Sequence, residues 1–191
     1  MYLRKLELKD APLMLSWMHD EMVTKYLQTD FGSKTLSKCH FFIERSLKDT
    51  ANMHLAIVSD EDEYMGTVSL KHIIDGSAEF AITVRSCAMG KGYSKYAMET
   101  IFDKGFDELN LKSIFWCVSP KNKRAIRFYD KNGYKHISPD SIKIGGGVQH
   151  GTDSQVSLVS HYKRGKEERN LRINSWSRQL NTDILFLRPA V

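Results

Sequence analysis

The stretch from Phe80 to Ser94 holds the residue types that bind phosphate. An apolar run, Phe-Ala-Ile-Thr-Val, leads into a turn with glycines at positions 90 and 92, and a segment with helical spacing follows. Glycines leave no side chain in the path of an anion, and the first N–H groups of a helix point at it with the positive end of the helix dipole behind them. We therefore predict an anion-binding site between Met89 and Ser94, with an ordinary glycine turn as the alternative.

The strand that precedes this turn has two unlike faces. Two-residue periodicity places Ala78, Phe80, Ile82 and Val84 on one face and Glu79, Ala81 and Thr83 on the other. A carboxylate among small residues is unusual on a face that only packs, so we expect this face to border a cleft. The alternative is a half-exposed strand with Glu79 in water.

The segments after the turn predict a βαβ unit. Residues Gly92–Leu109 have the spacing of an amphipathic helix, and Lys112–Val118 is rich in β-branched and aromatic residues, as strands are. A short helix follows, which starts at Asn122, carries Tyr129 inward and ends at Gly133. Ligands bind at the carboxyl ends of parallel strands, so Asn122 and Tyr129 are expected near the glycine turn.

The rest of the chain predicts further elements of one α/β domain. Strands are expected at about 3–8, 54–58, 64–72 and 155–163, and helices at about 10–19 and 35–47. In the second of these helices, Leu36 and Leu47 are among the residues expected to face inward. Four glycines among residues 138–154 predict a mobile loop. We assign residues 1–164 to the domain and 165–191 to a C-terminal extension, whose apolar run at 184–187 is expected to dock on the sheet or on a second subunit.

The order of these motifs resembles that of the GNAT superfamily of acyl-CoA-dependent N-acetyltransferases, especially the ribosomal-protein alanine N-acetyltransferase branch. The resemblance spans about residues 1–137 and rests on four segments: Leu3–Asp10 with the helix that contains Trp17, Tyr64–Leu70, Gly90–Tyr93 and Asn122–Tyr134. It implies an α/β (α+β) fold with a mixed, mostly antiparallel central sheet that splays between two parallel strands, and helices on both faces. One residue departs from the family pattern. Cys87 stands where the phosphate turn usually begins with Gln or Arg, but backbone amides are expected to hold the phosphates.

The resemblance also implies a cosubstrate, acetyl-CoA, and direct transfer of its acetyl group to a primary amine in a ternary complex. The implied cofactor-binding residues are Ile82, Thr83, Val84, Gly90, Lys91, Gly92, Tyr93, Ser94, Asn122 and Tyr129. Backbone groups of the splayed strand at 82–84 would bind the pantetheine arm and the thioester oxygen. Tyr129 matches the phenol that protonates the CoA sulfur, and Asn122 matches the asparagine that orients the pantetheine end.

The residue that takes the amine proton is open at this stage. Glu79 matches an acidic position of this branch and is the first candidate, acting directly or through water. His72 and His136 are alternatives, because histidine titrates in the useful range. In a reaction without a dedicated base, Glu79 would instead position the ammonium group.

Two other classes of function are weighed against the acetyltransferase. A CoA-binding sensor or interaction module without catalysis is the main alternative, but the presence of Asn122 and Tyr129 argues against it. A nucleoside-triphosphate-binding domain would require Gly-x-x-x-x-Gly-Lys-Ser/Thr, which residues 90–95 lack. The acceptor is not fixed by the sequence; a protein N-terminus, an amino sugar or another small amine would fit, and a homodimer is possible.

The amino-acid composition is that of a globular protein and does not by itself indicate a function. The chain has 191 residues, of which 41% are hydrophobic and 27% charged, with a net charge of +5. Its basic residues are scattered or, at 163–178, mixed with acidic ones, so we expect a solvated face and no nucleic-acid binding. Lys91, Lys95, Lys121 and Lys123 would suit the phosphates of CoA. Three widely spaced cysteines predict neither disulfides nor a metal site. With no membrane-spanning run and no secretion signal, a cytoplasmic location is expected.

Overall fold

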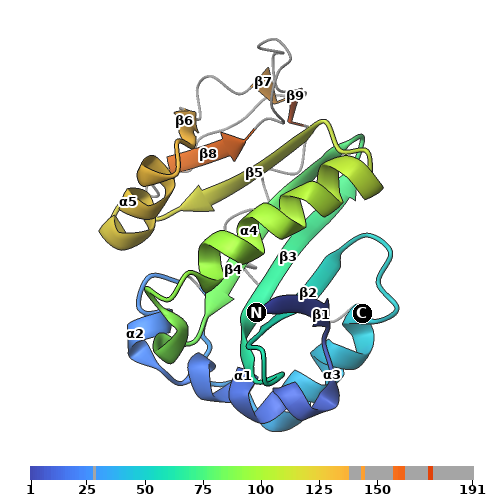
Figure 1. Cartoon of the computed structure of the whole chain (residues 1–191), viewed down its shortest axis with the longest axis vertical. Coiled ribbons are helices and arrows are strands. Elements are labelled where there is room, and N and C mark those ends of the chain that lie inside the picture. The colour runs from blue at the N-terminus through green and yellow to red at the C-terminus, as the bar shows by residue number, and fades with distance from the viewer. Residues whose placement is uncertain (28, 138–142, 145–156, 162–171, 174–191) are drawn as a thin grey trace.

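A computed structural model of the chain describes residues 1–27, 29–137, 143–144, 157–161 and 172–173 (Figure 1). Within this part, seven strands form one sheet in the order β1-β2-β3-β4-β5-β8-β6. They are β1 (Tyr2–Lys5), β2 (Met53–Val58), β3 (Tyr64–Ile74), β4 (Ser77–Val84), β5 (Ser113–Val118), β6 (Lys135–Ile137) and β8 (Ser157–His161). Within this sheet β4 and β5 are parallel, and the other neighbours are antiparallel. The predicted mixed, mostly antiparallel sheet is confirmed.

Helices cover both faces of the sheet, as predicted. The main helices are α1 (Ala11–Met18), α2 (Glu21–Thr24), α3 (Leu36–Ser46), α4 (Tyr93–Asp103) and α5 (Lys123–Lys131). In Figure 1, α4 crosses in front of β3 and β4, and its Ile101 and Phe102 share an apolar core with Phe80. A second core holds residues of α1 and α3 against Ala56 and Val58 of β2. Because Ile57 between them belongs to the first core, the two cores lie on opposite faces.

Short elements complete the described chain. They are the 3₁₀ turns η1 (Leu8–Asp10) and η2 (Ser86–Ala88), the π-helical turn η3 (Lys104–Glu108) after α4, and the parallel pair β7 (Lys143–Ile144) and β9 (Arg172–Ile173). No helix in the described ranges is both long and apolar enough to cross a membrane.

Most predicted elements are found close to their expected bounds. The helix predicted at 35–47 is α3, with the Thr35 hydroxyl accepting a hydrogen bond from the N–H of Lys38. The inward orientation of Leu36 and Leu47 is wrong: they are 40% and 50% exposed, because they lie at the two ends of the helix and the core contacts its middle. The strand predicted at 155–163 is β8. Most of the glycine loop and the apolar run at 184–187 lie outside the described residues.

His54 is a buried titratable group in the core that contains α3. It lies on β2, is 8% exposed, packs edge-on against Phe42 at 5.0 Å between ring centres, and its Nδ1 lies 2.8 Å from the Ser69 hydroxyl. Burial lowers the pKa of His54 from 6.5 to about 4. The folded protein therefore holds a neutral imidazole where the unfolded chain binds a proton.

We predict that the stability of the protein falls as the pH drops from 6.5 towards 4. In that window the unfolded chain protonates His54 and the folded protein does not, which lowers the free energy of unfolding by roughly 3 kcal/mol in total. Urea unfolding across this range checks it. The double variant His54→Leu/Ser69→Ala should lose this part of the pH dependence of the free energy of unfolding, and Ser69→Ala alone should keep it. The same pH dependence in all three proteins would contradict the assignment to His54.

Candidate active site

The central feature of the site is the separation of β4 from β5. Among the described residues, their pairing is limited to three positions and stops where Glu79 faces Phe115, although β4 continues to Val84 and β5 to Val118. Figure 1 shows the two strands diverging towards their carboxyl ends. The predicted splay is confirmed. It leaves backbone groups of β4 unpaired on the side of β5, where a ligand can use them.

The end of β4 keeps its place because β3 holds its other edge. Gly66 of β3 pairs with Val84, and a Cβ built at Gly66 would lie 2.3 Å from the carbonyl oxygen of Thr83 and 2.9 Å from the Cα of Val84. Only glycine permits this approach. Beyond the strand, the N–H of Arg85 still donates to the carbonyl of Met65 at 2.8 Å. The sheet thus opens on one side of β4 without losing its support on the other.

A cavity of about 360 Å³ occupies the gap and the space in front of it; we call it the cleft. Its walls come from β4, from β5, from the glycine turn, from the beginning of α5 and from the α2 region. Among the predicted site residues, the cleft brings together Glu79, Ile82, Thr83, Val84, Gly90, Ser94, Asn122 and Tyr129. Lys91, Gly92 and Tyr93 belong to the same turn but do not line the cleft.

The glycine turn has the backbone geometry that the sequence predicts. Gly90 and Gly92 have φ angles of 77° and 89°, which side chains other than that of glycine rarely adopt. A Cβ at either position would meet no atom within 4 Å, so the space in front of the turn is open. Gly92 is the N-cap of α4, and no described side chain caps this helix. The first N–H groups of α4 are therefore available to an anion.

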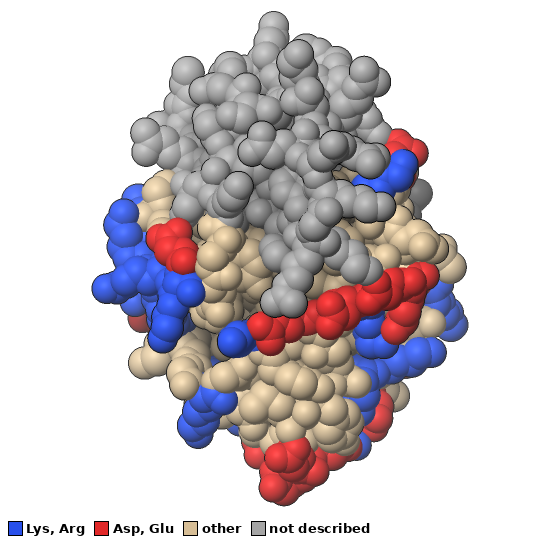
Figure 2. Space-filling view, turned by 45° about the horizontal axis from the view of Figure 1, so that its top comes forward, with Lys and Arg blue, Asp and Glu red and all other residues tan. Residues whose placement is uncertain are grey.

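Positive charge surrounds this turn. Lys91 and Lys95 lie in the turn and in the first turn of α4. Arg124, which the sequence did not single out, reaches from α5 to the sulfur of Met89 and lines the cleft. Figure 2 shows Lys and Arg side chains gathered on the side that carries α5. Nothing in the spacing after Asn122 distinguished Arg124 from the lysine beside it, because the contact depends on how α5 packs.

Tyr129 provides a neutral phenol in the wall of the cleft. Its side chain is 7% exposed and packs on Trp116 at 5.2 Å between ring centres. Burial raises the pKa of Tyr129 well above the ordinary value of 10. Its hydroxyl has no hydrogen-bond partner among the described residues. At neutral pH the phenol keeps its proton and can donate it.

Asn122 caps α5 and still lines the cleft. Its Oδ1 accepts a hydrogen bond from the N–H of Ala125 at 3.1 Å. Capping uses the oxygen of the amide and leaves its NH₂ group for a ligand.

Glu79 is a buried carboxylate in an ionic cluster, so the alternative of a carboxylate in water is wrong. It is 6% exposed, Lys71 donates to its Oε1 at 3.1 Å, and His72 Nδ1 lies 3.3 Å from its Oε2. Burial by itself would raise the pKa of Glu79, but the contacts with His72 and Lys71 outweigh it and hold the pKa below the usual range. Glu79 is therefore charged at neutral pH.

His72, which contacts Glu79, lies in an irregular part of the backbone. It has a φ angle of 53° where the register between β3 and β4 shifts, and its N–H donates to the Asn52 side chain at 2.7 Å. Asn52 is in turn held by Asp49 at 2.8 Å. A histidine with positive φ is uncommon and implies that its surroundings impose the conformation. The other candidate histidine, His136, has its backbone in β6, but its side chain lies outside the described part.

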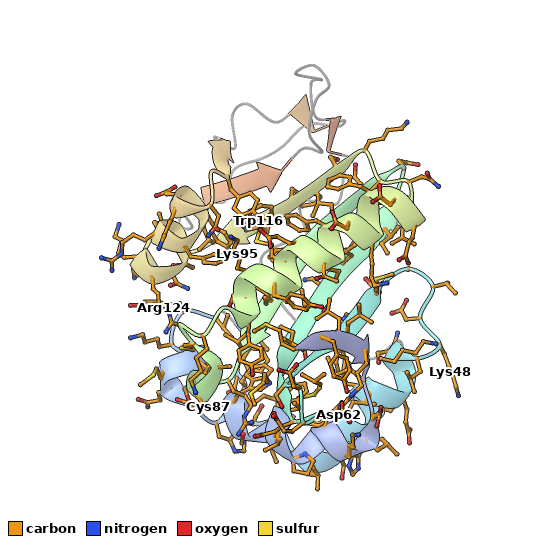
Figure 3. All side chains as sticks on the ribbon, in the orientation of Figure 1. Lys48, Asp62, Cys87, Lys95, Trp116 and Arg124 are labelled. Carbon is orange, nitrogen blue, oxygen red and sulfur yellow. The ribbon has the colours of Figure 1, made fainter. Side chains whose placement is uncertain are left out.

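The strand β5 contributes two cleft residues that the sequence did not single out. Trp116, labelled in Figure 3 beside α4, is 1% exposed and lines the cleft. Cys117 also lines it and is only half-buried, and burial raises the pKa of its thiol to about 12. An apolar strand gives no signal for either role, because the cleft opens only where β4 and β5 part. Within the described ranges, no group of three or more His, Cys, Asp and Glu side chains could hold a metal ion.

The glycine turn can bind an anion, and the phenol and carboxylate in the gap can move a proton, which suits the acyl-CoA-dependent transfer that the sequence resemblance implies. Comparison with known proteins agrees. The family model described as an acetyltransferase (GNAT) domain matches residues 1–135. The chain belongs to this family and is an acetyl-CoA-dependent N-acyltransferase.

The matching relatives are named as N-acetyltransferases. An uncharacterized N-acetyltransferase, p20, of Bacillus licheniformis is 32% identical over 138 residues, which cover 70% of this chain and 78% of that protein. A spermidine N(1)-acetyltransferase of Vibrio cholerae is 28% identical over 92 residues, or 47% of this chain and 53% of that protein. The crystal structure of a spermidine N-acetyltransferase from Vibrio cholerae in complex with CoA and spermine has the same fold, with a TM-score of 0.69 and 21% identity over 84% of this chain and 94% of that one. The ribosomal-protein alanine branch stays a prediction.

We predict that Gly66→Ala destabilises the protein by about 2 kcal/mol or more, because the added Cβ collides with the backbone of β4 and not with a side chain that can move. Gly32→Ala is the matched control, since a Cβ there meets only the Asp30 side chain, at 3.4 Å. Urea unfolding of both variants measures the difference. If Gly66→Ala were as stable as the parent, β3 would not hold β4 in this way.

Proposed function

We propose that this protein transfers an acetyl group from acetyl-CoA to a primary amine directly, with both substrates bound in the cleft at once. The observation that carries the proposal is the continuity of the cleft. One cavity runs from the glycine turn, past the unpaired edge of β4, to Tyr129 and Glu79. Groups suited to phosphate, to an amide arm and to proton transfer follow one another along it.

The glycine turn is proposed to hold the phosphates of CoA. The residues are Gly90, Lys91, Gly92, Tyr93 and Ser94, with their backbone N–H groups as the principal donors. The open space in front of both glycines and the uncapped start of α4 support this assignment. Backbone groups of Ile82, Thr83 and Val84 are proposed to bind the pantetheine arm. When bound, acetyl-CoA supplies an acyl group activated as a thioester.

Tyr129 is proposed as the general acid that protonates the departing sulfur. Its raised pKa keeps the proton on the phenol until negative charge develops nearby. Asn122 is proposed to orient the pantetheine end through the amide NH₂ group that helix capping leaves free.

Glu79 is proposed to receive the amine. As a buried carboxylate it attracts an ammonium group, and it accepts one of the amine's protons directly or through water. His72 touches the same carboxylate and is 39% exposed, so it offers the proton a path to solvent. Without Lys71 the carboxylate would be a stronger base, since Lys71 helps to lower its pKa.

The proposed acceptor is a small primary amine or a peptide N-terminus. Spermidine N(1)-acetyltransferases of Vibrio cholerae and Escherichia coli are among the relatives, which makes spermidine the first acceptor to test. A spermidine N-acetyltransferase from Vibrio cholerae has a dodecameric structure, and a homodimer or a larger assembly is proposed here on that likeness. The division into a domain at 1–164 and an extension at 165–191 also stays a prediction.

The competing function is a CoA-binding module without turnover. It is excluded if spermidine, an amino sugar or a peptide, added as acceptor, causes the release of CoA thiol from acetyl-CoA.

We predict that Tyr129→Phe slows turnover about 10- to 1000-fold, the range expected for loss of a general acid, with little loss of CoA affinity. Thiol release from acetyl-CoA is measured with spermidine, amino sugars and peptides as acceptors, and CoA binding by calorimetry. Phe128→Leu, a change at the neighbouring ring, serves as the control for packing and should keep most of the turnover. Parent-like turnover in Tyr129→Phe would remove the tyrosine from the mechanism.

We predict that Glu79→Gln lowers kcat/KM about 100-fold or more and abolishes the acidic limb of its pH profile. Lys71→Met should move this limb to higher pH, because loss of the ammonium group lets the pKa of Glu79 rise. The two profiles are compared with that of the parent on its best acceptor. A Glu79→Gln profile that keeps the parent's limb would assign the proton to another group.

A further inference from the structure

Two buried polar atoms in the walls of the cleft lack a hydrogen-bond partner among the described residues: the hydroxyl of Thr83 and the indole Nε1 of Trp116. Thr83 is 5% exposed and Trp116 is 1% exposed. A buried donor without a partner costs about 1–3 kcal/mol, and most buried side-chain polar atoms are paired. Two such donors on residues that line one cavity indicate groups kept for a ligand.

The two donors approach the gap from opposite faces of the sheet. Trp116 belongs to the core that contains α4 and contacts the ring of Tyr129. Thr83 is paired across β3 with Thr67 and shares a strand face with Glu79. An extended ligand that lies between β4 and β5 would therefore meet one donor from each face of the sheet.

They also differ in their position along the cleft. Trp116 is one residue beyond Phe115, the last residue of β5 that pairs with β4. Thr83 is four residues beyond Glu79, towards the glycine turn. Trp116 thus lies at the reacting end, near Tyr129, and Thr83 lies nearer to the end that faces the phosphates.

We propose that the Trp116 indole N–H and the Thr83 hydroxyl bind the acyl-pantetheine arm of CoA through neutral carbonyl oxygens. Trp116 binds the carbonyl nearest the thioester, and Thr83 binds an amide carbonyl nearer the pyrophosphate. An indole N–H only donates, so its partner must be an acceptor, and neither donor carries the charge that a phosphate or carboxylate calls for. The amide groups of the arm meet this requirement. The inference rests on the proposed function, to which it adds two side-chain contacts.

The first test is Thr83→Val, which removes the hydroxyl and keeps the shape. Affinity for CoA should fall about 2- to 12-fold, the range of one net hydrogen bond, and affinity for 3′,5′-ADP, which lacks the arm, should not change. Stability of the free protein should stay the same or rise, because an unpaired buried hydroxyl is lost. Calorimetry and urea unfolding measure these quantities.

Thr67→Val is the matched control, on the neighbouring strand and in register with Thr83. Its hydroxyl is buried but lies 2.6 Å from the hydroxyl of Tyr64. This variant should show the opposite result, a loss of stability with CoA affinity retained.

The second test leaves Trp116 in place, because its ring packs in the core. In ¹H–¹⁵N spectra the chain gives three indole N–H signals, one per tryptophan. The Trp116 signal should shift downfield and exchange more slowly with CoA, and not with 3′,5′-ADP. The Trp17 signal should not move, since its N–H already donates to the Tyr64 hydroxyl. Signals are assigned with Trp116→Phe or, by elimination, with Trp17→Phe and Trp176→Phe.

The outcomes separate the two proposals. A parent protein that binds no CoA contradicts the proposed function itself. If the parent binds CoA, equal CoA affinity in Thr83→Val together with an unmoved Trp116 signal overturns the inference. A loss of affinity for 3′,5′-ADP in Thr83→Val would also overturn it, because the hydroxyl would then serve the nucleotide half.

Discussion

The site depends on an unequal pairing of one strand. On one edge β4 pairs with β3 up to its last residue, where Gly66 lets the two backbones come close, and on the other edge it leaves β5 after Glu79. A strand released on both edges would not keep its position, and a strand paired on both edges would leave no gap. The separation of β4 from β5 also sets the direction of the cleft. The glycine turn follows the free end of β4, and α5 follows the diverging end of β5.

Burial raises the pKa of both ionisable groups that the gap brings together, but the net shifts of the two pKa values are opposite. Tyr129 is surrounded by aromatic rings and no described group stabilises its anion, so burial keeps the phenol neutral. Glu79 is as deeply buried, but Lys71 and His72 stabilise its anion more than burial opposes it. One cleft therefore holds a proton donor and an anion at the same pH. This pair of states suits the proposed reaction, in which the phenol gives a proton to the sulfur and the carboxylate faces the amine.

The sequence predicts what depends on local patterns. Hydrophobic periodicity located the main helices and strands, and the glycine spacing predicted the turn that caps α4. The surroundings of Glu79 could not be predicted, because they depend on the shift in register that brings His72 to the carboxylate. Trp116 had no visible role either: a tryptophan in an apolar strand is core in most sheets, and only the parting of β4 from β5 makes it a residue that lines a cavity.

Polar groups are paired differently near the cleft and away from it. In the α1–α3 core, Trp17, Tyr64 and Thr67 form one hydrogen-bonded chain. Along the cleft, by contrast, Thr83 and Trp116 lack partners among the described residues, and α4 begins without a side-chain cap. Unpaired groups lower the stability of the free protein, and a ligand that pairs with them restores it. Because these groups follow one path through the molecule, we expect the ligand that restores most stability to be an extended one, with anionic oxygens at one end and neutral carbonyls along its length.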